Sequence, residues 1–142
     1  MPSARNEVLI ERPVDAVFAF VADGTNGPRW RPGVLDVEHA SGEGVGAVYR
    51  QGVRGPGGRR ITADYEITTF EPNRRLGFKA IAGRVRPTGE YQFEGRDART
   101  KVTFRLDAEL SGWKKLVMGG AVQKTMDAEV ASLDRLKGVL ES

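Results

Sequence analysis

The sequence predicts an α+β fold in which a curved antiparallel sheet of about seven strands surrounds one long C-terminal helix, with two short helices after the first strand. Three changes of pattern lead to this prediction. Apolar residues recur at helical spacing soon after residue 12, alternate with polar residues between residues 34 and 110, and return to helical spacing from residue 113 onward. We expect a single domain over residues 1–142, with its core at about residues 7–140, because this length leaves no room for a second core.

The N-terminal part is expected to hold one strand and two helices. Residues 7–12 are typical of a strand, and Pro13 suits the first turn of a helix, where its missing N–H group costs nothing. Val14, Val17, Phe18 and Val21 then form one apolar stripe over residues 13–23. A second, short helix is expected at residues 27–30, where a proline follows two residues later and ends it.

The remaining strands are expected at residues 34–40, 45–53, 59–70, 76–82, 86–95 and 101–110. In each of them one face is mostly apolar and the other polar, which is typical of an antiparallel sheet with one wet face. The closing helix, about 25 residues long, gathers one apolar stripe: Trp113, Met118, Val122, Met126, Leu133, Leu136 and Leu140. Such a helix must lie along the apolar face of the sheet.

Composition excludes several classes of protein. There is no cysteine and only one histidine, His39, so we expect neither a metal site nor another cofactor. His39 itself is interpreted as an exposed residue at a strand end. No apolar run reaches the roughly 18 residues of a membrane span, and the N-terminus lacks the apolar segment of a secretory signal. We therefore expect a cytoplasmic protein without stable membrane insertion.

The net charge of +3 and the isoelectric point of about 9.4 raise the question of nucleic-acid binding. The basic residues are spread over turns and strand faces and are interleaved with acidic ones, and no nucleic-acid-binding motif accompanies them. We expect no nucleic-acid partner. The oligomeric state is not predicted.

The chain resembles a known superfamily. The segments IERPVDAVFAFVAD, GPRWRPGVLDVE, GVGAVYR, YEITTFEPNRRLGFKA, GEYQFEG and TKVTFRLDAEL, followed by a long helix, are similar to the START-like, polyketide cyclase/dehydrase-like (SRPBCC) superfamily. The resemblance covers about residues 7–140 and implies the helix-grip fold, as in birch pollen allergen proteins. It also implies an apolar cavity between sheet and helix. The superfamily includes lipid carriers, aromatic polyketide cyclases, hormone receptors and chaperone co-activators, and the fold alone does not choose among them.

The residues themselves leave two interpretations of this space open. Small residues on the inward strand faces, such as Ala63, Ala80 and Gly89, together with Gly119 and Gly120 on the final helix, would leave unfilled volume. Alternatively, they interdigitate with large aromatic residues. If the cavity exists, we expect its wall to include ten residues: Trp30, Tyr49, Gln51, Tyr65, Phe78, Tyr91, Phe104, Met118, Val122 and Met126.

Trp30, between Arg29 and Arg31, has three interpretations: a nucleic-acid contact, a structural plug or the rim of a pocket. The last two are favoured, with the ring turned inward and both arginines in water. Glu129 is the one carboxylate near the apolar stripe of the final helix. Buried without a partner it could act as a general acid or base; otherwise it reaches water or a strand arginine.

We expect the protein to bind or carry a small hydrophobic ligand, either a lipid or an aromatic polyketide-like compound. One alternative is a cyclase or dehydratase acting on an aromatic substrate in the same cavity, assisted by Tyr49, Tyr65 or Tyr91, with Glu129 as the weak candidate for an acid or base. A second alternative is a co-chaperone-like module, which would expose an apolar patch on the outer sheet face.

Overall fold

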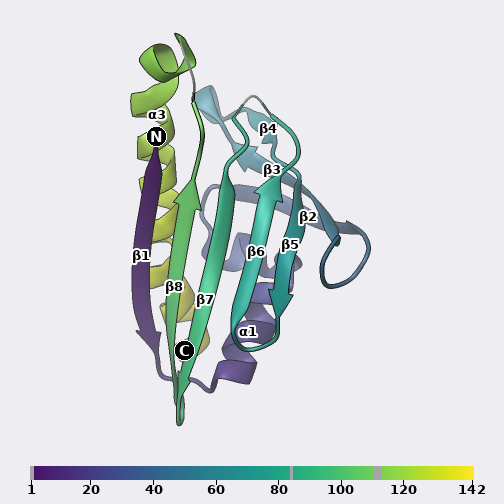
Figure 1. The fold of residues 1–142 in the computed structure, drawn as a ribbon, viewed down its shortest axis with the longest axis vertical. Helices are drawn as coiled ribbons and strands as arrows, with labels where there is room; N and C mark the ends of the chain where they lie inside the picture. Colours follow the sequence, from purple (N-terminus) through teal and green to yellow (C-terminus); the bar gives the residue numbers. More distant parts are fainter. Residues whose placement is uncertain (1, 84, 111–112) are drawn as a thin grey trace.

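One curved antiparallel sheet organises the fold (Figure 1). The computed structural model describes residues 2–83, 85–110 and 113–142, and for Pro56 and residues 113–119 it describes the backbone only. The strands of the described part are β1 (Ser3–Ile10), β2 (Val34–Ser41), β3 (Val48–Arg54), β4 (Arg60–Thr62), β5 (Tyr65–Glu71), β6 (Arg75–Ala80), β7 (Thr88–Arg96) and β8 (Arg99–Asp107). They pair in the order β1-β8-β7-β6-β5-β3-β2, with β4 pairing β3 off this path.

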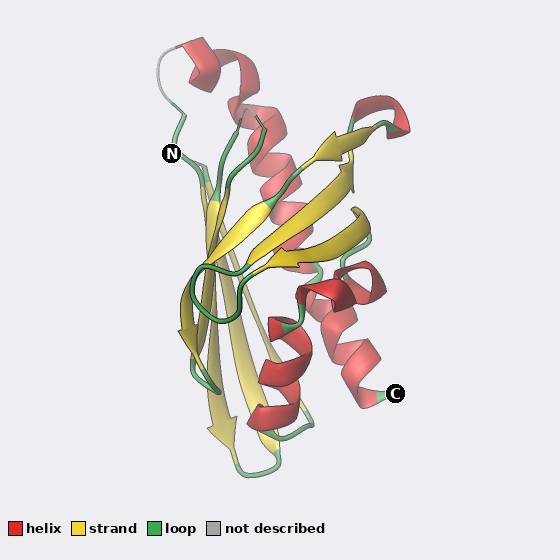
Figure 2. Ribbon diagram, turned by 90° about the vertical axis from the view of Figure 1, so that its right-hand side faces the viewer, coloured by secondary structure: helices red, strands yellow, loops and turns green. Residues whose placement is uncertain are grey.

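The helices lie on the concave side of the sheet (Figure 2). They are α1 (Val14–Ala22), α2 (Gly27–Trp30), α3 (Trp113–Ala131) and α4 (Leu133–Glu141), with the 3₁₀ turns η1 (Gly24–Asn26) and η2 (Pro56–Gly58). The short helices after β1 and the long C-terminal helical segment confirm the predicted fold class. None of the helices in the described ranges is both long and apolar enough to span a membrane.

The first strand begins earlier than its sequence pattern indicates. Residues 7–12 are the predicted strand, whereas β1 runs from Ser3 to Ile10 and pairs with β8 over its whole length. The early residues carry no clear alternation because Asn6 turns a polar side chain inward, where its Nδ2 donates a hydrogen bond to the carbonyl of Val130 at 3.0 Å. Pairing with β8, which is remote in sequence, therefore decides where this strand starts.

The predicted strand at residues 59–70 is two strands, β4 and β5, separated by Ala63 and Asp64. At the break, the carboxylate of Asp64 accepts a hydrogen bond from the backbone N–H of Gln51 at 3.0 Å. A side chain thus takes the place of a ladder hydrogen bond, and β4 and β5 each pair separately with β3.

The predicted C-terminal helix is likewise interrupted, at Ser132 between α3 and α4. The Ser132 hydroxyl and its N–H both donate to the carbonyl of Glu129, the N–H at 3.1 Å. These are bonds across three residues, which tighten the turn and end α3. Beyond the break, Leu133 and Leu136 of α4 are fully buried and fasten the C-terminus to the core.

Contacts from β1 to the C-terminal helices hold the two ends of the chain together. The ammonium group of Lys137 donates to the carbonyl of Leu9 at 2.7 Å, and the N–H of Glu11 donates to the carboxylate of Glu141 at 2.8 Å. Elsewhere on the same concave face, Phe18 of α1 packs edge-on against Phe70 and Phe93. The core is therefore filled under α1 and under α4.

Candidate functional site

A cavity of about 790 Å³ lies between the concave face of the sheet, the segment from α1 to α2, and α3. Its wall is mostly apolar, with residues such as Ile67, Leu76, Leu106 and Val122. At one end it is lined by Ile61, Ala82, Val85 and Pro87 from β4 and the loop between β6 and β7, together with Ala121 and Thr125 of α3. Since Ile61 is 42% exposed, this end is the mouth of the cavity.

The ten residues predicted for the wall divide into three groups. Seven of them line the cavity: Trp30, Gln51, Tyr65, Phe78, Tyr91, Val122 and Met126. Tyr49 and Phe104 lie behind the wall, where Tyr49 stacks on Tyr65 at 5.1 Å and Phe104 stacks on Tyr91 at 4.1 Å between ring centroids. The side chain of Met118 lies outside the described residues.

Small residues account for only part of the free space. Ala63, Ala80 and Ala82 line the cavity. At Gly89, by contrast, a Cβ atom would collide with the ring of Phe78, so this glycine makes room for an aromatic side chain. Gly120 is exposed and faces no described atom within 4 Å, so it does not shape the cavity as the sequence led us to expect. Both interpretations of the small residues therefore apply, at different positions.

Trp30 closes the cavity at the end of α2. Its side chain is 3% exposed, lines the cavity and meets the ring of Tyr91 edge-on at 6.1 Å. It thus belongs to the core and to the cavity wall at once. The flanking Arg29 is exposed, as predicted, with its guanidinium 5.0 Å from the centre of the Phe20 ring.

The prediction that Arg31 stays in water is wrong. Its side chain is only 15% exposed and lines the cavity, where Nε forms an ion pair with the carboxylate of Glu129 on α3. Its Nη1 donates a hydrogen bond to Oε1 of Gln51 on β3 at 2.9 Å, and Nε2 of Gln51 donates to the carbonyl of Ala63 at 3.2 Å. Arg31 follows the last residue of α2 with an extended backbone, and both it and the buried Trp30 line the cavity.

Electrostatics holds this arginine charged. Burial is the largest influence and by itself would lower the pKa of Arg31. The negative charge of Glu129, together with smaller contributions from Tyr91, Tyr65 and the hydrogen bond to Glu129, more than offsets it, so the pKa is raised. Glu129, 24% exposed, is thus neither unpartnered nor paired with a strand arginine. Its partner comes from the segment between α2 and β2.

Two phenols share this polar end of the cavity. Burial raises the pKa of Tyr65 and of Tyr91 above the usual range of tyrosine, and the positive charge of Arg31 offsets only part of that effect. Both side chains are therefore neutral O–H donors at ordinary pH. Among the described residues, neither hydroxyl has a side-chain or backbone hydrogen-bond partner, whereas the hydroxyl of Tyr49 donates to the carbonyl of Ala22 at 3.4 Å.

The role of Arg31 in the cavity was not predicted, because both arginines that flank the buried Trp30 were expected to lie in solvent. A signal for it existed in Glu129, since a carboxylate on the apolar stripe of a helix requires a cationic partner when it is buried. His39, by contrast, lies exposed on β2, stacked on Tyr49 at 4.9 Å, and does not line the cavity.

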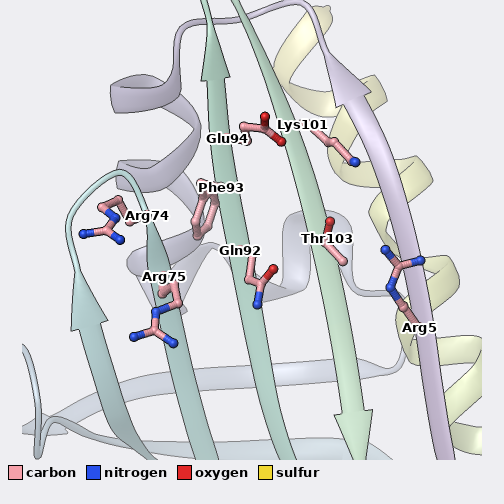
Figure 3. A pocket seen from close by; sticks show the side chains of 8 residues that line it. All are labelled: Arg5, Arg74, Arg75, Gln92, Phe93, Glu94, Lys101 and Thr103. Carbon is pink, nitrogen blue, oxygen red and sulfur yellow. The ribbon is translucent and has the colours of Figure 1, made fainter.

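A second hollow, of about 480 Å³, lies on the outer face of the sheet (Figure 3). Three of its four cations have acidic neighbours: Arg5 pairs with Glu7 at 3.1 Å, Lys101 with Glu7 at 3.6 Å, and Arg75 with Glu71 at 2.7 Å and Glu90 at 3.4 Å. The hollow is open and polar, as expected for a solvated strand face. The internal cavity is the better candidate for a functional site.

A helix held by a curved antiparallel sheet, with an apolar cavity between them and a few polar groups at one end, defines a helix-grip protein with an internal cavity. Residues 1–141 match the family model described as polyketide cyclase / dehydrase and lipid transport, and the chain belongs to this family. No curated protein matches the sequence.

Solved structures share the fold at low sequence identity. The protein TTHA0849 from Thermus thermophilus is 21% identical with a TM-score of 0.81, covering 99% of this chain and 97% of that one. A START superfamily protein from Mycobacterium smegmatis is 16% identical, with a TM-score of 0.80 and coverages of 98% and 97%. The ZhuI aromatase/cyclase from Streptomyces sp. R1128 is 22% identical, with a TM-score of 0.75 and coverages of 98% and 93%. These similarities establish the fold.

Proposed function

We propose that the protein binds a small, largely apolar molecule, a lipid or an aromatic polyketide-like compound, in the cavity between the sheet and α3. The observation that carries this proposal is the cavity itself. Its volume of about 790 Å³ falls within the roughly 300–1,000 Å³ of known small-molecule sites. Its wall is apolar except for a few convergent polar groups, which is the usual composition of such a site.

A fluorescent probe tests this proposal directly. N-Phenyl-1-naphthylamine is uncharged and fluoresces strongly in apolar surroundings, so its signal should rise on binding. Ala80→Leu adds volume on the cavity wall, whereas Ala40→Leu adds the same volume to an exposed position of β2. We expect Ala80→Leu to weaken probe binding about ten-fold, a loss of about 1.4 kcal/mol, and Ala40→Leu to leave it unchanged.

The native ligand can be sought by organic extraction of the purified protein followed by mass spectrometry. We expect an apolar compound recovered from the wild type and reduced in Ala80→Leu. If the wild type neither binds the probe nor yields any compound, the proposal fails.

A cyclase or dehydratase activity is the second candidate. It is favoured by the carboxylate of Glu129 and the hydroxyls of Tyr65 and Tyr91, which face the same space and are groups that can transfer protons or stabilise a developing oxyanion. Incubation of the extracted compound with fresh protein discriminates the two functions. A compound recovered unchanged supports binding or transport, and a new product supports catalysis.

A co-chaperone-like role has less support. The large apolar side chains that are exposed in the described part of the chain are Leu9, Leu35, Val45 and Ile61. Leu9 lies in β1, Leu35 in β2 and Val45 in the loop between β2 and β3. Ile61 lies in β4 and belongs to the cavity mouth. Single exposed residues of this kind are normal on a protein surface and do not make a docking patch.

A further inference from the structure

The polar end of the cavity has unused hydrogen-bonding capacity. Arg31 spends Nε on Glu129 and Nη1 on Gln51, and its Nη2 has no partner among the described residues. The hydroxyls of Tyr65 and Tyr91 are likewise without a protein partner in the described part of the chain. All three residues line the cavity, so their free N–H and O–H groups are available to a bound molecule. Free donors outnumber free carboxylates here, since Glu129 is paired with Arg31 and the other carboxylate of the wall, the exposed Asp23, accepts hydrogen bonds from the N–H and the hydroxyl of Thr25.

The charges of Arg31 and Glu129 balance each other, and the exposed Asp23 adds a negative charge to the cavity wall. Arg31 and Glu129 form a pair with side chains that are 15% and 24% exposed, so the ligand would meet both charges at close range and with little screening by water. A carboxylate attracted by Arg31 would be repelled by Glu129, and an ammonium group would meet the opposite balance. The pair also separates both charges from bulk solvent, so a charged head group would lose its hydration without gaining an unpaired counter-ion.

On these observations, and on the proposed function, we propose that the cavity selects an uncharged apolar molecule that carries a carbonyl group. The carbonyl oxygen accepts one hydrogen bond from Tyr65 and a second from Tyr91 or Arg31, and the apolar body occupies the space toward the cavity mouth. A carbonyl matches the surplus of donors, because it accepts two hydrogen bonds and offers none. The ion pair excludes fatty-acid-like anions from the same position.

If the ion pair had a purely structural role, its removal would change stability but not ligand preference. Arg31, Glu129 and Gln51 link the segment after α2, α3 and β3, so removing any of them alters the stability of the fold. A structural pair, however, would leave the preference among ligands unchanged. Ligand selectivity, measured in folded protein, is therefore the decisive readout.

The experiment uses displacement of bound N-phenyl-1-naphthylamine at pH 8 by two molecules of the same chain length, 2-undecanone and undecanoate. In the wild type we expect the ketone to displace the probe at a concentration at least about ten-fold lower than the carboxylate, beyond what micelle formation by the carboxylate explains. Probe binding by itself tests the cavity. If the probe binds and both competitors are equally effective, the present inference is overturned while the proposed function stands; if the probe does not bind, both fall.

Glu129→Gln provides the sharper test, because it keeps the size of the side chain and removes its charge. We expect undecanoate to gain about ten-fold or more in affinity, since Arg31 would then be an unmatched cation, and 2-undecanone to change by less than about three-fold. Asp127→Asn, an equivalent change at an exposed position of α3, is the matched control and should alter neither competitor. An unchanged ketone-to-carboxylate ratio in folded Glu129→Gln would contradict the inference.

Tyr65→Phe keeps the test decisive if Glu129→Gln fails to fold. It removes one carbonyl donor but no charge and little volume. We expect the affinity for 2-undecanone to fall about three- to ten-fold more than the affinity for N-phenyl-1-naphthylamine, each measured on the same folded variant. Equal ketone affinity in wild type and Tyr65→Phe would remove this hydroxyl from the subsite and contradict the proposed binding mode.

Discussion

Gly24 lies directly against the phenol of Tyr65. A Cβ atom at residue 24 would overlap the Tyr65 hydroxyl and lie 2.8 Å from two ring carbons of Tyr49. The two tyrosine rings are stacked on each other at 5.1 Å, and the η1 turn that contains Gly24 covers their edge. The absence of a side chain at Gly24 therefore determines where the Tyr65 hydroxyl can point, and this hydroxyl is one of the free donors of the cavity.

Gly24→Ala should move Tyr65 and disturb the cavity. We expect the free energy of unfolding to fall by about 1–3 kcal/mol, the usual cost of overpacking, and probe affinity to fall with it. The measurements are urea denaturation and titration with N-phenyl-1-naphthylamine. Gly33→Ala is the control, because a Cβ atom there meets nothing within 4 Å. Equal effects of the two substitutions would show that Gly24 does not position the tyrosine.

Most of the architecture could be predicted because a half-buried strand and an amphipathic helix impose different periods on the sequence. Residues 76–82 and 86–95, for example, alternate as β6 and β7 require. The breaks could not be predicted in the same way. The break between β4 and β5 is made by a hydrogen bond from the N–H of Gln51 to Asp64, and the break in the C-terminal helix by two hydrogen bonds from Ser132 to the carbonyl of Glu129. These bonds leave the apolar period of the sequence intact.

Cavity residues could be predicted where the burial of an apolar side chain places them, and not where an ion pair between distant residues places them. Trp30, Tyr65, Phe78 and Tyr91 line the cavity because an apolar inward face must hold its aromatic residues. Arg31 depends on a partner 98 residues away, Glu129, and a single sequence does not reveal such a pair. The lesson is specific: a carboxylate on an apolar helical stripe predicts a buried cation, even when its position in the chain is unknown.

Removing one partner of the ion pair should destabilise the fold more than removing both partners. In Glu129→Ala, Arg31 is left buried without a counter-ion, and we expect a loss of about 3 kcal/mol, at the low end of the range for buried pairs because Glu129 is 24% exposed. The double variant Arg31→Met, Glu129→Leu should recover most of this loss, since it leaves no unpaired charge. Chemical denaturation of the three proteins measures this, and a double variant as unstable as Glu129→Ala would contradict the account.

Alkaline pH should destabilise the fold through Tyr65 and Tyr91. The unfolded chain releases phenol protons near the ordinary pKa of 10.0, while the folded protein retains them at higher pH. The stabilising contribution is thus complete below pH 10 and is lost as the pH rises above it, by about 1.4 kcal/mol per pH unit for each tyrosine. Phenolate absorbance near 295 nm should rise together with unfolding. The variant Tyr65→Phe, Tyr91→Phe should show a shallower decline, and an unchanged slope would contradict this assignment.

Gly138→Ala should stabilise the protein. Gly138 lies in the middle of α4, and a Cβ atom there meets nothing within 4 Å. Alanine costs less conformational entropy in a helix, so we expect a gain of about 0.5–1 kcal/mol, seen as a higher melting temperature. Ligand affinity should not change because α4 does not contribute to the described cavity wall. A lower melting temperature would contradict this prediction and show that the helix requires glycine at residue 138.

Trp30 should report both stability and binding. Trp30→Phe keeps an aromatic side chain in the core and is expected to cost about 1–2 kcal/mol of stability, whereas Trp30→Ala, which opens a larger void, should cost about 3–5 kcal/mol. Because Trp30 also lines the cavity, we expect the folded Trp30→Ala protein to bind N-phenyl-1-naphthylamine about 1–3 kcal/mol more weakly.

Fluorescence separates the two roles of this tryptophan. Trp113 is the only other tryptophan, so Trp113→Phe is the background in which Trp30 emission is measured. Energy transfer from Trp30 to the bound naphthylamine should quench its emission in proportion to occupancy, and 2-undecanone should restore it by displacing the probe. If folded Trp30→Ala binds the probe as tightly as the wild type, Trp30 is a core residue whose face in the cavity contributes nothing to binding, and the wall that matters is formed by Tyr65, Phe78 and Tyr91.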